Sequence, residues 1–278
     1  MDLGLGLPIS DPARLPEWAR RAEAAGFATV ALLDRLAYDN PEPLVALAAL
    51  AGATTRIRLQ TEVLLAPLRG TALLAKQAAT LDLMSGGRLT LGVGIGGRDD
   101  DHAAAGVPID RRGPIMDRML ADLHDIWAGR AYPQTPVGPA PATPGGPPLL
   151  IGGFAPAALA RVARYGAGFL CAAPLQWAGG LVRTVHDQWA EAGRTGRPRL
   201  VCQINAAAGS PESIARARRA VAEYYAFTGR SGWGDPVTDA GQLADTVAAY
   251  RDFGADELVL YCYGDDPAQI ELLAETVL

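Results

Sequence analysis

IRLQTEVLLAPLRGTALLAKQAATLDLMSGGRLTLGVG, residues 57–94, is the stretch that decides the fold. An apolar run at 57–64 suits a buried strand, and a second such run follows at 89–94. Between them, residues 71–84 have helical periodicity and are followed by Gly86 and Gly87, which are typical of a helix end. A strand, a helix and a second strand in this order predict a βαβ unit with parallel strands.

The same alternation continues outward from this unit in both directions. Further strands are expected at 3–8, 29–33, 148–151, 168–172, 200–206 and 257–262. Helical stretches separate them, among them 11–25, which Gly26 ends, and a last one at 267–277. Eight pairs of strand and helix fit a closed (β/α)8 barrel, the TIM barrel of the α/β class, better than an open doubly wound sheet.

Residues 1–278 are expected to form one domain, because barrels of this kind commonly run to about 250 residues. Residues 129–148 are too rich in Pro and Gly for a helix or a central strand, so we expect a long surface loop there. It is not a domain linker, since each half would be left with an unclosed sheet. A second loop at 228–237 is either a lid or a plain connection.

Composition excludes several classes of partner. Hydrophobic residues make up 49% of the chain and charged residues 20%, with a net charge of −5. Nucleic acids and anionic membranes attract clustered cations, which this acidic chain lacks, so neither partner is expected. The N-terminus has no basic leader and no apolar run spans a bilayer, which predicts a cytoplasmic protein. Cys171, Cys202 and Cys262 lie in apolar runs and are expected to be buried free thiols.

The active site of such a barrel lies at the C-terminal ends of its strands. Asp34 and Arg35 follow the second expected strand, and Glu62 lies near the end of the third; these three are the candidates for catalysis. The double glycine Gly152-Gly153 precedes a helix, whose free N–H groups and dipole suit a phosphate. The candidates for cofactor binding are Glu62, Val63, Gly94, Ile95, Gly96, Gly97, Arg112, Gly152, Gly153, Phe154 and Ala155.

Other kinds of site lack their residues. The three histidines, His102, His124 and His186, have no metal-binding spacing, so no metal site is expected. The acidic run 99–101 is interpreted as a solvated loop or helix cap. Neither a Gly-x-Ser-x-Gly elbow nor a Walker-type phosphate loop occurs in the sequence.

Residues 54–113 resemble the luciferase-like monooxygenase superfamily. The resemblance rests on the segments TTRIRL at 54–59, AKQ at 75–77, TLD at 80–82, SGGR at 85–88 and LGVG at 91–94, and it extends to LLIGGFAPAALARVARYGAGFL at 149–170. It implies a barrel that binds FMN or coenzyme F420 at its C-terminal end and acts on a small organic substrate, by hydride transfer or by O2 activation. It also implies a homodimer and a cis peptide bond between Glu62 and Val63.

The sequence departs from this family after the second strand. Many relatives have Asp-His there, whereas this chain has Asp34-Arg35. Arginine stays charged at neutral pH and is a poor proton shuttle, so the usual acid–base step is in doubt. Two alternatives therefore stay open beside the enzyme: a flavin-binding protein without turnover, and a barrel hydrolase that uses Glu62 and Asp34. The dimer is expected to use the alanine-rich helices at 46–53 and 72–79.

Overall fold

Eight parallel strands close into a barrel in the order of the chain, each paired with its sequence neighbours and β8 paired with β1. The computed structural model describes residues 1–8, 11–230, 232, 234–264 and 266–278. Within them the strands are β1 Asp2–Gly6, β2 Thr29–Leu32, β3 Arg58–Leu65, β4 Leu89–Gly94, β5 Leu149–Gly152, β6 Gly168–Cys171, β7 Arg199–Ala206 and β8 Glu257–Cys262. The predicted (β/α)8 barrel is confirmed.

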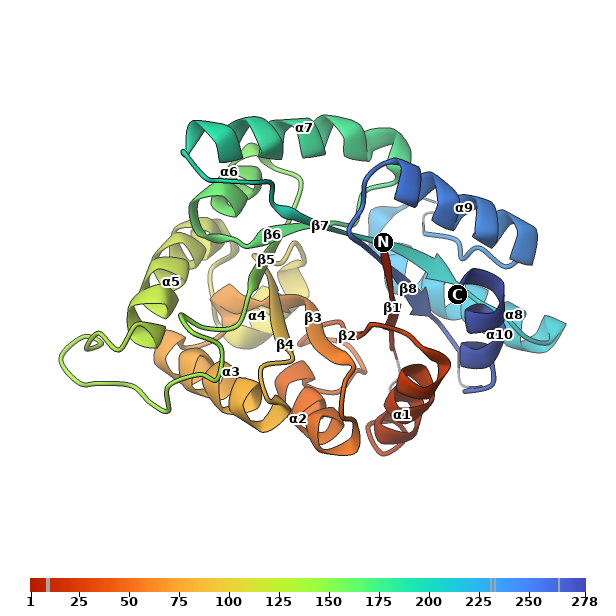
Figure 1. Cartoon of the computed structure of the whole chain (residues 1–278), viewed down its shortest axis with the longest axis horizontal. Helices are drawn as coiled ribbons and strands as arrows, with labels where there is room; N and C mark the ends of the chain where they lie inside the picture. The colour runs from red at the N-terminus through yellow and green to blue at the C-terminus, as the bar shows by residue number, and fades with distance from the viewer. Residues whose placement is uncertain (9–10, 231, 233, 265) are drawn as a thin grey trace.

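Helices follow the strands and surround the barrel (Figure 1). Their bounds are α1 Leu15–Ala25, α2 Pro43–Ala53, α3 Thr71–Ser85, α4 Asp99–Ala105, α5 Arg112–Trp127, α6 Pro156–Tyr165, α7 Leu175–Glu191, α8 Pro211–Tyr225, α9 Ala240–Asp252 and α10 Gln269–Val277. Short 3-10 turns lie at Ala66–Leu68, Ile109–Arg111 and Ala226–Thr228. None of the described helices has the length and apolarity that crossing a bilayer requires.

Glycine ends two of these helices as predicted. Gly26 after α1 and Gly86 after α3 have φ angles of +98° and +67°, in the left-handed region that favours glycine. α1 begins at Leu15 instead of residue 11, because a turn precedes it and Pro16 occupies its first turn. β1 ends at Gly6, two residues before the predicted end, and the loop at 228–237 lies partly outside the described residues.

Charged side chains form ion pairs at the N-terminal end of the barrel. Glu257 is buried there, and Arg58 and Arg199 donate hydrogen bonds to it over 3.2 and 2.8 Å; both arginines also bind Asp2. Because the two positive charges compensate the buried carboxylate, this end forms a polar floor. The opposite end, where the strands finish, is the one left open for a ligand; we refer to it as the mouth.

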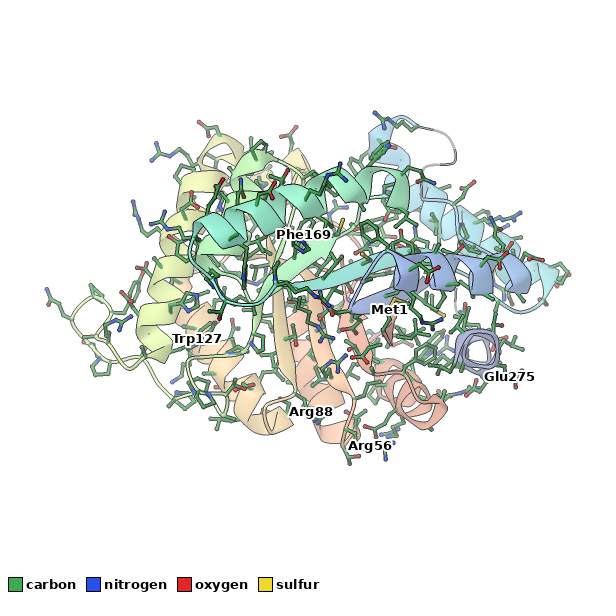
Figure 2. All side chains as sticks on the ribbon, turned by 45° about the horizontal axis from the view of Figure 1, so that its top comes forward. Met1, Arg56, Arg88, Trp127, Phe169 and Glu275 are labelled. Atoms are coloured by element: carbon green, nitrogen blue, oxygen red, sulfur yellow. The ribbon has the colours of Figure 1, made fainter. Side chains whose placement is uncertain are left out.

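The predicted loop at 129–148 has neither helix nor strand. Thr143 in this loop donates its backbone N–H to Asp82 on α3 over 2.7 Å. Gly146 lies so close to the ring of Trp127 that a Cβ there would come within 2.2 Å of it. Figure 2 shows Trp127 at the end of α5, beside this loop. The loop is therefore fastened to the outside of the barrel, away from the mouth.

Candidate functional site

Strand β3 provides the centre of the mouth. The peptide bond between Glu62 and Val63 is cis, as predicted, and the pairing of β3 with β4 shifts register there. The Val63 side chain lies over two glycines: a Cβ added to Gly94 or Gly152 would come within 2.6 or 2.8 Å of it. Gly94 is thus needed for packing against Val63, a different reason from the close ligand approach that the sequence had indicated.

Glu62 is a buried carboxyl group without a partner. It is 6% exposed, and neither of its carboxyl oxygens has a hydrogen bond within the part of the chain that the structure describes. Burial raises the pKa of Glu62 well above its ordinary value, and the negative charge of Glu257 adds to the rise. The Tyr261 hydroxyl donates to the Glu62 backbone carbonyl over 3.1 Å. Burial therefore favours the protonated form of Glu62.

Asp34 is held at the end of β2 by an arginine on the next loop. Its carboxylate accepts hydrogen bonds from the Leu65 N–H over 2.7 Å and from Arg69 over 2.6 Å. Arg69 also binds Glu42 over 2.9 Å. Burial raises the pKa of Asp34, and the Arg69 charge limits that rise. Asp34 thus joins the ends of β2 and β3.

Arg35 is buried and binds the acidic run at the start of α4. Its Nε donates to Asp101 over 2.5 Å and its Nη2 to Asp100 over 2.9 Å. Asp101 is 1% exposed and also accepts the backbone N–H groups of Leu36 and Ala37. The run at 99–101 does open a helix as expected, but Asp101 is a buried ion-pair partner, so its interpretation as a solvated residue was wrong.

The glycines after β4 lead into α4 past a buried histidine. Gly96 has a φ of +70° and lies against His102, whose Nε2 is 3.1 Å from the Ile95 carbonyl. A Cβ on Gly97 would meet open space. Arg98 then crosses to α8, where its Nη2 donates to the Tyr224 carbonyl over 2.8 Å and its guanidinium lies over the Phe227 ring. Of this segment, Gly97 is the residue open to a ligand.

The turn after β5 has the form expected of a phosphate site. Gly153 has a φ of +140°, and a Cβ there would come within 2.8 Å of Ala158. Ala155 precedes α6 and offers no side-chain cap, so the first N–H groups of the helix have no side-chain acceptor. Phe154 is 56% exposed.

Arg112 lies at the start of α5, the helix next to α6. The following residue, Gly113, accepts a hydrogen bond from Arg161 on α6 over 3.3 Å, so the first turn of α5 lies against α6. Arg112 donates one N–H to the Ile109 carbonyl, whereas its buried Nε has no partner among the described residues. A positive charge with unused hydrogen-bonding capacity therefore lies at the start of α5, on the helix that contacts α6.

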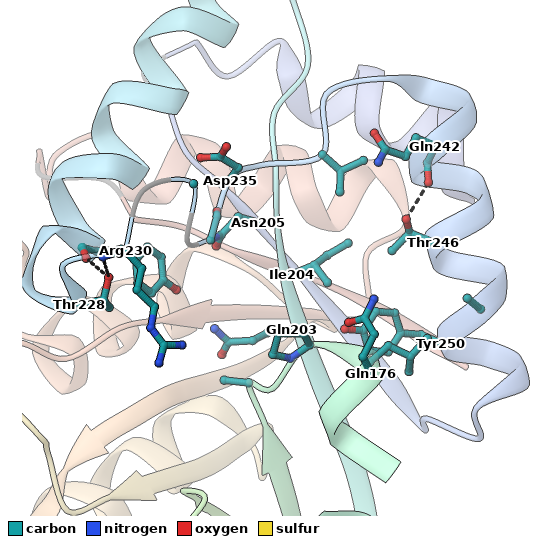
Figure 3. A pocket seen from close by; sticks show the side chains of 18 of the residues that line it. Gln176, Gln203, Ile204, Asn205, Thr228, Arg230, Asp235, Gln242, Thr246 and Tyr250 are labelled. Carbon is teal, nitrogen blue, oxygen red and sulfur yellow. Dashed lines mark hydrogen bonds between the residues drawn. The ribbon is translucent and has the colours of Figure 1, made fainter. Parts of the chain in front are cut away.

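A cavity of about 1000 Å³ opens at the C-terminal ends of β6 and β7 (Figure 3). Phe154 from the turn after β5 and Ala172 from the end of β6 form one side. Gln203 and Asn205 come from β7, and Asn205 donates to the Gly234 carbonyl over 2.7 Å. Helices α7 and α9 form the outer wall with Leu175, Gln176, Thr246 and Tyr250, among others.

The sequence interpretation overlooked three features of this site. Arg69 and Asp101 were not recognised as partners of Asp34 and Arg35. Gln203 and Asn205 were assigned only to a strand, although two polar side chains at alternate positions of an apolar strand are a signal for one shared polar face. Both side chains line the cavity, together with Ile204 from the same strand.

Known proteins resemble this chain in sequence. The family model described as luciferase-like monooxygenase matches residues 3–273. An uncharacterized protein of Mycobacterium tuberculosis is 34% identical over 177 residues, which cover 52% of this chain and 61% of that protein. The F420-dependent glucose-6-phosphate dehydrogenase of Nakamurella multipartita is 30% identical over 207 residues, 66% of this chain and 60% of that protein. The chain thus aligns with about three fifths of each relative.

Solved structures share the whole fold. An F420-dependent secondary alcohol dehydrogenase in complex with an F420-acetone adduct superposes with a TM-score of 0.81 at 17% identity, covering 99% of this chain and 98% of that one. This neighbour holds an F420 adduct, and another structural neighbour, a riboflavin lyase, holds a modified FMN; it has a TM-score of 0.76 at 18% identity.

Proposed function

The chain belongs to the luciferase-like monooxygenase family, and from that membership we propose that it is an oxidoreductase that binds coenzyme F420 or FMN at the mouth of its barrel. Its reaction in this proposal is hydride transfer between the cofactor and a small organic substrate. The observation that carries the proposal is the cavity of about 1000 Å³, which opens at the strand ends and shares Phe154 with the glycine turn after β5. A substrate in this cavity would lie next to a cofactor bound at that turn.

Coenzyme F420 is the first cofactor to test, because the Nakamurella relative is F420-dependent and is 30% identical over two thirds of the chain. FMN is the alternative. Both molecules present a tricyclic ring, a ribityl chain and a phosphate, so one mouth suits either.

The turn at residues 152–155 is the proposed phosphate seat. Gly153 has a φ of +140° and lies so close to Ala158 that a Cβ would come within 2.8 Å of it, and α6 begins there without a side-chain cap. Backbone N–H groups and the positive end of a helix dipole stabilise a phosphate, and Arg112 would add charge with its unpartnered Nε. Val63 from β3 and Gly97 after β4 would border the ring and the tail.

The bound cofactor supplies the redox chemistry, while the protein orients it and controls protons. Glu62 is the residue that we propose holds the exchangeable proton, because its carboxyl oxygens are buried without a hydrogen-bond partner among the described residues and burial raises its pKa. Asp34 and Arg35 are proposed as positioning residues. Each is held in an ion pair that connects two strand ends, so they fix the shape of the mouth.

A homodimer is part of the proposal. Val45 on α2 and Leu73 on α3 are 69% and 60% exposed, on the two helices where the sequence predicted an interface. Several alanines of these helices, such as Ala46 and Ala75, pack into the core of the barrel instead. Exposed apolar side chains on neighbouring helices suit contact with a second copy.

Turnover of the cofactor tests this function. Reduced F420 is mixed anaerobically with a panel of small ketones and aldehydes, and its reoxidation is followed together with alcohol formation. We expect both to proceed in equal amounts with at least one compound. Tight binding of F420 or FMN without any turnover would instead support a non-catalytic flavin-binding protein.

A further inference from the structure

The cavity at the ends of β6 and β7 has a mainly apolar wall. Apolar and aromatic side chains come from the strand ends and from α7, α8 and α9: Phe154, Leu175, Ile204, Tyr225, Val237 and Tyr250. Such a wall gains free energy by covering apolar surface, about 25 cal/mol for each Å² removed from water. It therefore suits a ligand with an apolar body.

Neutral polar side chains also stand within this wall, among them Gln176, Gln203 and Thr246. Gln203 is half-buried on β7, and its side-chain amide has no hydrogen-bond partner among the described residues. Its neighbour Asn205 is already used, because its amide binds the Gly234 carbonyl. Figure 3 shows Gln203 between Arg230 on one side and Gln176 and Tyr250 on the other. A free amide that can donate and accept matches a carbonyl or hydroxyl group.

The charges around the cavity disfavour an anion. Its lining contains Asp235 and Asp245 but a single basic residue in the described part of the chain, Arg230, which already has an interaction partner. The one lysine of the sequence, Lys76, is on α3 and binds the Gly138 carbonyl. A phosphate carries up to two negative charges and is normally held by several cations or N–H donors. The cavity does not offer such a set.

From this chemistry we propose that the cavity is a substrate site for a neutral molecule with an apolar, ring-sized body and one carbonyl or hydroxyl group, which Gln203 binds. A sugar phosphate, the substrate named for the Nakamurella relative, is excluded. The proposal rests on the proposed function, because it names the substrate class of the same mouth. Phe154 lines the cavity and also belongs to the turn proposed for the cofactor, so a substrate in the cavity would lie beside the cofactor.

Binding to the protein without cofactor tests the substrate class separately from the redox function. Acetophenone and benzoate have nearly the same shape, but benzoate is an anion. Their dissociation constants are measured by ligand-observed NMR, with glucose 6-phosphate as competitor. We expect acetophenone to bind at least about tenfold more tightly than benzoate, because a carboxylate loses hydration without gaining a cation. Glucose 6-phosphate is expected not to displace it.

A pair of variants ties the binding to Gln203. Gln203→Leu removes the amide at similar volume and should weaken acetophenone binding about two- to tenfold, the effect of one lost hydrogen bond. Gln77→Leu changes a half-buried amide on α3, outside the cavity, and should leave that binding unchanged. Neither substitution should alter F420 or FMN binding.

Four results would overturn the proposal. The first is that benzoate or glucose 6-phosphate binds as tightly as acetophenone, and the second is that acetophenone does not bind at millimolar concentration. The third is that Gln203→Leu has no effect on acetophenone binding. The fourth is that F420 displaces acetophenone, which would assign the cavity to the cofactor. Failure of the proposed function is a separate result, since it appears as absence of cofactor binding while acetophenone still binds.

Discussion

Glu62 combines burial with an empty hydrogen-bonding shell, and its protonation therefore depends on folding. The carboxyl has a raised pKa in the folded protein and its ordinary value, about 4.5, in the unfolded chain. Below pH 4.5 Glu62 is mostly protonated in both the folded and the unfolded chain, so its ionisation does not affect stability. Above that pH it ionises in the unfolded chain first, which lowers the free energy of the unfolded state. Stability must consequently fall as pH rises from about 4.5 towards the folded pKa.

Glu62→Gln should remove this pH dependence, because the amide keeps the shape of a protonated carboxyl and does not ionise. We expect the variant to lose less stability than the parent between pH 5 and pH 8 in urea unfolding. Its kcat should fall about 100-fold or more, the usual effect of losing a general acid, with cofactor affinity retained. A parent and variant with parallel pH profiles and equal kcat would refute the role of Glu62.

Arg35→Ala should destabilise the protein by about 3–5 kcal/mol, since it leaves the carboxylate of Asp101 buried without its cation. Arg197→Ala is a matched control: it breaks an exposed pair with Asp256 and should cost about 0–1 kcal/mol. Urea unfolding measures both. A loss below 1 kcal/mol for Arg35→Ala would show that the buried pair contributes little to the fold.

The sequence identified Asp34, Arg35 and Glu62 by their positions after strands, but it could not predict their partners. Asp101 is 66 residues from Arg35, and Arg69 is 35 residues from Asp34. Such pairings depend on how neighbouring strand ends meet in the closed barrel.

At the scale of elements, Glu23 connects α1 to the start of β3. Its carboxylate accepts the backbone N–H groups of Thr55, Arg56 and Ile57 over 3.0, 2.6 and 2.9 Å. Burial raises the pKa of Glu23, but these three hydrogen bonds outweigh it and lower the pKa to about 2. The carboxylate thus stabilises the fold above about pH 4.5, and this contribution disappears as pH falls towards 2.

Glu23→Gln should therefore cost about 1–2 kcal/mol at neutral pH, a value reduced for solvent screening at this partly exposed site. The difference between parent and variant should shrink as pH falls from 4.5 to 2, which thermal unfolding across that range would measure. A difference that stays constant with pH would contradict the role given to the carboxylate.

Helices α2 and α3 carry the proposed dimer contact. Leu73→Arg places a charge on the exposed apolar face of α3 and should shift the protein to monomers, as measured by light scattering. Leu272→Arg, at a partly exposed position of α10, is the control and should leave the dimer intact. A monomeric mass of the unaltered protein would contradict the proposed interface at once.

Helix ends were predictable where glycine marks them, as at Gly26 and Gly86. Helix bounds were harder to predict where a proline or a turn sets the start of the helix. Residues 12–14 are compatible with a helix and yet form a turn before α1. The two polar positions of β7, Gln203 and Asn205, showed that strand patterns carry information about the inner face of the barrel as well.

For the whole molecule, the repeat of strand and helix predicted the closed barrel. Eight parallel strands joined by short helical connections have few other possible arrangements. The cavity was not predictable in this way. It forms between α7, β7 and α9, and its size depends on how these elements pack (Figure 1).

Equilibrium titration of the purified protein with F420 and with FMN, followed by fluorescence, tests the central claim most directly. We expect saturable binding of at least one cofactor. Gly153→Ala should weaken it at least about tenfold, because the substitution strains a residue at φ +140° and its Cβ would collide with Ala158, which displaces the turn proposed to hold the phosphate. Gly52→Ala, where a Cβ meets open space, should bind like the parent. Absence of binding for both cofactors, or equal binding by the Gly153→Ala variant, would contradict the account.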